Sequence, residues 1–131
     1  MNERMSKQEA GRQIMREVLG TDYMDRREKS RNSFNAPLRD FSEESCFGGA
    51  WSSDALPRQT RSLLCLVMLT ALGRTNEFRI HVGAALNNGC SVEEIRSALF
   101  QATIYCGLPA GNESFRIAEE VLRERNALPP G

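Results

Sequence analysis

The stretch that decides the fold runs from Pro57 to Gly89 and reads PRQTRSLLCLVMLTALGRTNEFRIHVGAALNNG. Pro57 is a favourable first residue for a helix, because its missing N–H group costs nothing in the first turn. Gly73 is a typical helix end. The helix between them is apolar on every side, which predicts burial all round, part of it against another subunit in so short a chain. A second helix is expected from about Thr75 to Asn88. Its apolar face consists of Phe78, Val82, Ala85 and Leu86.

Helical patterns also occupy most of the remaining sequence. We expect helices over about 7–19, after Thr21, from Pro37, from the capping box at 91–94 to about 105, and from Pro109. No strand pattern of useful length appears. The sequence therefore predicts an all-α, bundle-like domain of about six to seven helices, and we expect residues 1–131 to form a single domain.

The segments between these helices give more local expectations. Residues 29–36 are polar and weakly patterned, so we expect a loop there. Leu38 and Phe41 are expected to start the apolar face of the third helix, and Trp51 lies just beyond its end. Residues 52–56 are expected to form another loop, and residues 127–131 a frayed tail.

The overall charge excludes some partners. The 17 acidic and 17 basic residues balance, so no field of one sign favours nucleic acid or an anionic membrane. Residues 1–7 are polar and predict no signal peptide, and no apolar stretch approaches the ~20 residues of a membrane span. We therefore expect a cytoplasmic protein.

The four cysteines and one histidine do not favour metal binding as the function. The cysteines are widely spaced with no CxxC pair, so they predict buried free thiols rather than disulfides. One histidine and scattered cysteines do not form a metal ligand set. No glycine-rich phosphate loop is present. The cysteines are Cys46, Cys65, Cys90 and Cys106.

His81 and Glu77 are the leading candidates for catalysis. His81 is the one histidine in the chain, and its side chain ordinarily titrates near neutrality. Glu77 precedes it by four residues, so both project from the same side of one helix. A carboxylate at that distance can fix the imidazole tautomer and raise its pKa, which favours a general acid. The alternatives are a surface Glu–His pair and a structural histidine bonded to a carbonyl.

Three arginines bracket the buried helix and are candidates for binding a carboxylate. A guanidinium group matches carboxylate geometry, although a structural salt bridge is an equal alternative. These candidates are Arg58, Arg61 and Arg74. Trp51, Tyr105 and Cys106 are further candidates for lining a pocket, with simple core packing as the alternative.

Several runs, taken together, closely resemble the carboxymuconolactone decarboxylase family. They lie at 61–64 (RSLL), 72–74 (LGR), 81–89 (HVGAALNNG), 93–95 (EEI) and 104–110 (IYCGLPA), and the likeness extends over about residues 10–124. The resemblance implies an all-α fold of the alkylhydroperoxidase D-like type that assembles as a homotrimer or homohexamer. It also implies loss of CO₂, without a cofactor, from 4-carboxymuconolactone to give β-ketoadipate enol-lactone in protocatechuate breakdown.

The resemblance also has implications for the roles of the candidate residues. His81 falls on the functional histidine of the superfamily, whereas Arg74 and Glu77 fall where its peroxidase members carry two cysteines. A thiol peroxidase is therefore disfavoured. Residues 32–53 match less clearly, so the substrate can differ. A same-fold enzyme acting on another lactone or β-keto acid, and a non-catalytic protein that binds a small carboxylate, remain alternatives.

Overall fold

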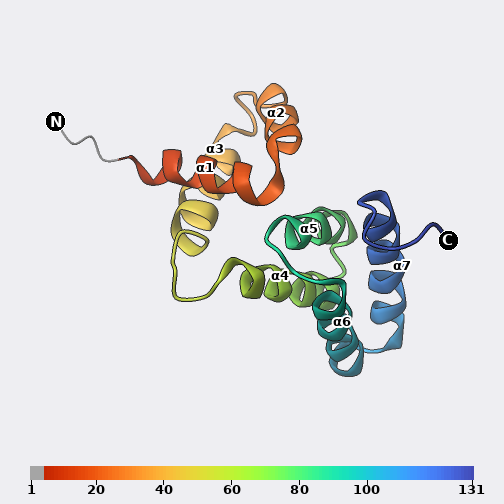
Figure 1. Cartoon of the computed structure of the whole chain (residues 1–131). Coiled ribbons are helices and arrows are strands. Elements are labelled where there is room, and N and C mark those ends of the chain that lie inside the picture. Colours follow the sequence, from red (N-terminus) through yellow and green to blue (C-terminus); the bar gives the residue numbers. More distant parts are fainter. Residues whose placement is uncertain (1–4) are drawn as a thin grey trace. The chain divides into compact units, whose positions relative to one another are not determined.

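Helices account for all the regular structure in residues 5–131, which are the residues described by the computed structural model. Figure 1 shows them in chain order. The contacts divide the chain into two compact units at Pro57 and Arg58. We call residues up to Pro57 unit 1 and residues Arg58–Gly131 unit 2, and describe each by itself. The single-domain expectation stays a prediction, whereas the all-α class is confirmed.

Unit 2 contains the stretch with which the sequence analysis began. Its four helices are α4 (Arg58–Leu72), α5 (Thr75–Asn87), α6 (Val92–Cys106) and α7 (Leu108–Glu124). All four contribute to one apolar core, which includes Leu66, Phe78, Leu99 and Ile117. The predicted capping box at the start of α6 is confirmed, because Ser91 and Glu94 each accept a hydrogen bond from the backbone N–H group of the other.

The α4–α5 pair forms an antiparallel hairpin. Gly73, with a φ of +69°, ends α4 in the left-handed region where glycine is favoured. The N–H group of Arg74 then donates to the carbonyl of Leu69 at 3.0 Å. Near the other end, the amide of Asn88 donates to the hydroxyl of Ser62 at 2.8 Å. The Ser62–Asn88 bond indicates which residues of α4 and α5 lie opposite each other.

Unit 1 is built from α1 (Lys7–Leu19), α2 (Thr21–Lys29), α3 (Ala36–Phe41) and the π-helix η1 (Ser42–Ala50). Helix α1 crosses η1 at Gly11, where a Cβ atom would lie only 1.7 Å from the carbonyl oxygen of Glu43. Glycine is therefore required for this close approach of two backbones.

A cluster of charged and polar side chains holds the elements of unit 1 together. Glu43 on η1 is fully buried and accepts hydrogen bonds from Arg27 on α2 and, at 3.0 Å, from Gln8 on α1. Arg31 donates to Asp40, which also accepts from Gln8 at 2.9 Å. One buried carboxylate thus connects three helices.

One expectation about burial is wrong. Leu38 and Phe41 are 69% and 64% exposed, because α3 passes directly into η1 and the inward positions fall instead on Glu43 and Phe47. Helix α4 is not buried on every side within this chain, and the expected burial of its remaining surface against another subunit stays a prediction. Three of its side chains are 42–69% exposed, namely Leu64, Met68 and Leu72.

The predictions for the thiols and the C-terminal tail also need correction. All four cysteines are free, as expected, but Cys90 alone among them is buried, whereas Cys46 and Cys106 are exposed. The tail is partly ordered by packing, because Ala127 and Leu128 lie against the core of unit 2. In the described part of the chain, no helix is long and apolar enough to cross a membrane.

Candidate functional site

The predicted catalytic pair lies on the face of α5 that contacts α4. Glu77, His81 and Asn88 are spaced by four and seven residues, so they share one helix face. Asn88 belongs to this face and donates to Ser62 of α4. The face therefore points toward α4. We call the strip formed by Ser62 on α4, Glu77 and His81 on α5, and the C-cap residue Asn88 the α4–α5 seam.

The register of the hairpin separates the arginines along this seam. Ser62 lies opposite Asn88. Because the two helices are antiparallel, Leu69, seven residues after Ser62, lies opposite His81, seven residues before Asn88. Arg61 is then roughly 12 Å from that level along the helix axis, at a rise of about 1.5 Å per residue. Arg74, at the N-cap of α5, lies roughly 10 Å away in the opposite direction. Arg61 and Arg74 therefore lie at levels on either side of His81 along the helix axes.

Burial controls the protonation of His81. The imidazole is half-buried, and desolvation lowers its pKa below 6.5, while the nearby Glu77 carboxylate acts in the opposite direction. Glu77 thus has the effect predicted from the sequence, but burial outweighs it. At neutral pH the resting imidazole is therefore uncharged, and the simple expectation of a raised pKa is wrong.

Glu77 has polar contacts of its own near the start of α5. It lies in the first turn of α5, where the exposed N–H groups of the helix favour a negative charge. The side-chain amide of Asn76 also donates to it at 3.2 Å. Glu77 is exposed, whereas His81 is half-buried, so the pair spans from the surface toward the interior of the seam.

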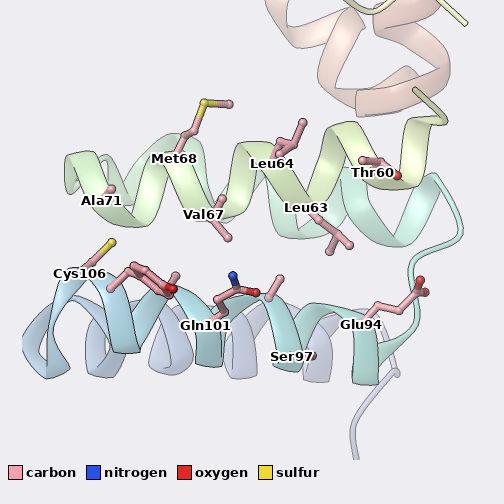
Figure 2. A pocket seen from close by; sticks show the side chains of 13 residues that line it. Thr60, Leu63, Leu64, Val67, Met68, Ala71, Glu94, Ser97, Gln101 and Cys106 are labelled. Carbon is pink, nitrogen blue, oxygen red and sulfur yellow. The ribbon is translucent and has the colours of Figure 1, made fainter. Parts of the chain in front are cut away.

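Tyr105 and Cys106 lie in a different place from the histidine. Both line a groove between α4 and α6, and Figure 2 shows Cys106 at one end of it. The groove uses Leu63 and Val67 of α4, which project from the side of that helix turned away from Arg61 and Cys65. The structure thus does not bring Tyr105 and Cys106 together with His81, and their predicted contact with substrate stays untested.

Trp51 belongs to unit 1. It is 6% exposed, its ring stacks on Phe47 with centroids 5.5 Å apart, and its backbone N–H group donates to the carbonyl of Cys46 at 3.0 Å. These contacts give Trp51 a packing role at the end of η1. Its proposed role as a wall of the substrate pocket stays a prediction.

Two features of the structure were not found from the sequence. The Ser62–Asn88 hydrogen bond joins two polar residues 26 positions apart, and only the NNG ending of α5 signalled Asn88. The buried Glu43 cluster of unit 1 had no signal, because Glu43 lies in a polar run typical of a helix surface. Among the described residues, no group of three or more His, Cys, Asp or Glu side chains is arranged to hold a metal ion.

Comparison with known proteins agrees with this all-helical architecture. Residues 37–120 match the model of the carboxymuconolactone decarboxylase family. The chain is 37% identical over 119 residues to 4-carboxymuconolactone decarboxylase of Acinetobacter baylyi, an overlap that covers 91% of this chain and 89% of the relative. It is 29% identical over 114 residues to a nitrosuccinic acid decarboxylase of Metarhizium robertsii, covering 87% and 80% of the two chains.

A third relative is an uncharacterised 15.0 kDa protein of Paracoccus denitrificans, 33% identical over 85 residues and 63% of each chain. The family match includes α4, α5 and α6 and therefore the whole α4–α5 seam. The segment that carries Glu77 and His81 is thus part of what the chain shares with its relatives, and the chain belongs to the carboxymuconolactone decarboxylase family.

Proposed function

We propose that this protein decarboxylates 4-carboxymuconolactone to β-ketoadipate enol-lactone without a cofactor. The observation that carries the proposal is the similarity to 4-carboxymuconolactone decarboxylase over nearly the full length of both chains. The Glu77–His81 pair supplies the acid–base group that such a reaction needs. We also propose that the protein works in the cytoplasm, within protocatechuate breakdown, as a homotrimer or homohexamer.

The chemistry sets two tasks for the site. Cleavage of the bond to the departing carboxylate leaves an electron pair on the ring carbon, and the conjugated double bond delocalises it onto the lactone carbonyl oxygen. The site must stabilise this dienolate and then return a proton to carbon. Hydrogen-bond donors already aimed at the developing charge usually give the largest catalytic effect.

His81 fits the first task in its uncharged form. A neutral imidazole retains one N–H group, which can donate to the dienolate oxygen. Bound carboxylates and the developing negative charge favour protonation of His81, so the same group can then deliver the proton to carbon. Glu77 stabilises the imidazolium form, because its carboxylate acts to raise the pKa of His81. General acid–base help of this kind contributes about 10²–10⁴-fold.

The arginines fit the binding of a substrate with two carboxylates. Arg58 and Arg61 at the start of α4, or Arg74 at the N-cap of α5, can each offer a guanidinium group to these carboxylates. We expect Arg61→Gln and Arg74→Gln to raise KM more than they lower kcat. This division follows if these arginines bind the substrate carboxylates equally well before and during the reaction.

The proposal is tested by incubating the purified protein with freshly prepared 4-carboxymuconolactone. Lactone consumption is followed by ultraviolet absorbance, and CO₂ release is measured in parallel. We expect turnover by the wild type and a loss of about 10²–10⁴-fold in kcat for His81→Ala, with little change in the thermal unfolding midpoint. Glu119→Gln, at an exposed pair on α7, is the matched control and should retain full activity.

A second substrate has a specific observation in its favour. The nitrosuccinic acid decarboxylase relative covers 87% of this chain, and a nitro group can also hold the electrons left by departing CO₂ on its oxygens. Nitrosuccinate therefore belongs in the same assay. Turnover of nitrosuccinate or of another lactone or β-keto acid, with none of 4-carboxymuconolactone, would reassign the substrate. Tight binding of the lactone without turnover would instead favour a carboxylate-binding protein.

A further inference from the structure

Helix α7 contacts α5 on the side of α5 that faces away from His81. The two helices pack against each other within unit 2 (Figure 1). Residues 79, 83 and 87 of α5 are spaced by four positions, so they lie along one side of that helix. His81 is two positions from Arg79 and two from Gly83, which places it about 200° around the helix axis from both. Contacts to this row of residues therefore act on α5 from behind the histidine.

Each residue of this row has a partner near the C-terminal end of α7. The guanidinium group of Arg79 donates to the carboxylate of Glu120. Arg125, the C-cap residue of α7, donates from Nη1 to the backbone carbonyl of Gly83 at 3.3 Å and from Nη2 to the side-chain oxygen of Asn87. One arginine thus connects the end of α7 to two successive turns of α5.

The backbone around Arg125 is itself fixed. Asn126 has a φ of +60°, which is typical of the residue that follows a helix end. The N–H groups of Ala127 and Leu128 then both donate to the carbonyl of Leu122, at 2.7 and 3.2 Å. The side chains of Ala127 and Leu128 pack against the core of unit 2. The side chain of Arg125 is exposed, but its anchored backbone lets it restrain α5 relative to α7.

Gly83 leaves the space that this contact needs. Glycine in the interior of a helix is destabilising relative to alanine, so its presence there calls for a physical reason. Gly83 has the negative φ of an ordinary helical residue, so no left-handed conformation requires it. A Cβ atom at position 83 would lie 3.0 Å from Nη1 of Arg125, closer than such atoms normally approach. The missing side chain lets the guanidinium group reach the backbone of α5.

The position of α5 matters because His81 must meet the reacting group of the substrate precisely. A misplacement of about 1 Å can cost about 10²-fold in rate. The Ser62–Asn88 hydrogen bond, across the α4–α5 seam, lies seven residues from His81. Arg79 and Gly83 lie much nearer, two residues before and two residues after it. Their contacts to α7 therefore restrain the turn of α5 that carries the histidine.

We propose that Arg125 is a positioning residue, which holds the turn of α5 that carries His81 in place while Gly83 admits its guanidinium group. Arg125 contacts no substrate in this role. The effect on catalysis rests on the proposed function, whereas the effect on His81 is measured without any substrate.

Two variants release this contact in different ways. Arg125→Gln removes the guanidinium group, whereas Gly83→Ala keeps its charge and displaces it with the added methyl group. Both should lower kcat on 4-carboxymuconolactone, by about tenfold for Arg125→Gln, while KM changes less than about twofold. Both should also move the proton NMR titration midpoint of His81 toward 6.5, because a displaced α5 buries the imidazole less well. Gly83→Ala should not lower the thermal unfolding midpoint, since alanine favours a helix.

Arg123→Gln is the matched control. Arg123 lies in the last turn of α7 and donates to Glu119 and to the carbonyl of Pro129, so its loss should leave kcat and the His81 midpoint unchanged. Unchanged kcat and an unchanged midpoint in both Arg125→Gln and Gly83→Ala would overturn the proposal. Equal losses in Arg123→Gln would do the same, and so would a midpoint shift in Arg125→Gln alone, which would report charge and not position.

Failure of the proposed function has a different signature. If the wild type does not turn over the lactone, the substrate assignment fails, and the His81 midpoint in the same three variants still decides whether Arg125 positions α5.

Discussion

His81 shows what a spacing pattern can and cannot predict about a residue. The interval of four residues was enough to place Glu77 and His81 on one helix face, because helix geometry is local. It was not enough to predict the pKa of His81, since that depends on burial by residues distant in the sequence. The structure shows that burial lowers this pKa more than Glu77 raises it. The net direction could not have been inferred from α5 alone.

The protonation of His81 can be measured directly. His81 is the one histidine of the chain, so its Cε1–H signal in proton NMR of the untagged protein needs no assignment. We expect a titration midpoint below 6.5, because burial disfavours the charged imidazole. Glu77→Gln should lower the midpoint further, because it removes the carboxylate that favours the imidazolium. Glu119→Gln on α7 should leave it unchanged.

The lowered pKa of His81 also predicts how the free energy of unfolding changes with pH. Between the folded pKa of His81 and about 6.5, the unfolded chain binds more protons than the folded chain, so the free energy of unfolding rises with pH in this window. This contribution should be absent in His81→Gln. An NMR titration midpoint above 6.5 for His81 in the wild type would show that Glu77, not burial, sets the direction of the pKa shift. It would restore the resting general acid expected from the sequence.

At the scale of elements, the segment from α3 to η1 was the least predictable part of the chain. Pro37 correctly signalled a helix start, and Trp51 does lie just beyond the helical segment. The change to a π-helix at Ser42 has no simple sequence signal, because it adds residues to each turn and alters which ones face inward. Leu38 and Phe41 are therefore exposed, whereas Glu43 is buried. A helical pattern continued from Pro37 could not anticipate this outcome.

The Arg27–Glu43 pair should contribute strongly to the stability of unit 1. Both side chains are at least nine-tenths buried, so removing one charge leaves the other without its partner in a dry environment. We expect Glu43→Gln to lower the free energy of unfolding by about 3–5 kcal/mol. Urea unfolding followed by the fluorescence of Trp51, the single tryptophan, measures the change. Glu119→Gln, which weakens an exposed pair, should cost about 0–1 kcal/mol.

The pH dependence of this contribution has a definite sign. Burial acts to raise the pKa of Glu43, but hydrogen bonds from Arg27 and Gln8 and the charge of Arg27 together lower it below 4.5. The stabilisation should therefore be complete above about pH 4.5 and be lost as the pH falls through the folded pKa. Arg27→Met combined with Glu43→Leu should recover much of the loss. Equal stability of Glu43→Gln and the wild type would show that the pair is not a major support of unit 1.

At the scale of the whole molecule, the apolar pattern predicted the helices better than it predicted what covers them. The pattern of α5, α6 and α7 correctly identified core positions such as Phe78, Leu99 and Val121, because those helices bury a single stripe. Helix α4 is apolar all round, and its excess apolar surface lies at Leu64, Met68 and Leu72. A sequence pattern states that a face is apolar, but not whether the same chain or another covers it.

The proposed assembly into a homotrimer or homohexamer should appear in the thermal stability of the protein. A partner that binds only the folded chain stabilises it by mass action, so the unfolding midpoint of the wild type should rise with protein concentration. Scanning fluorimetry of Trp51 over a wide concentration range measures this. Ile104→Glu, at an exposed apolar position of α6, should remove most of the dependence, and Phe34→Glu, at an exposed position of unit 1, should retain it. A wild-type midpoint that is the same at every concentration would mean that subunit association adds nothing to stability, and the exposed side chains of α4 and α6 would then need another explanation.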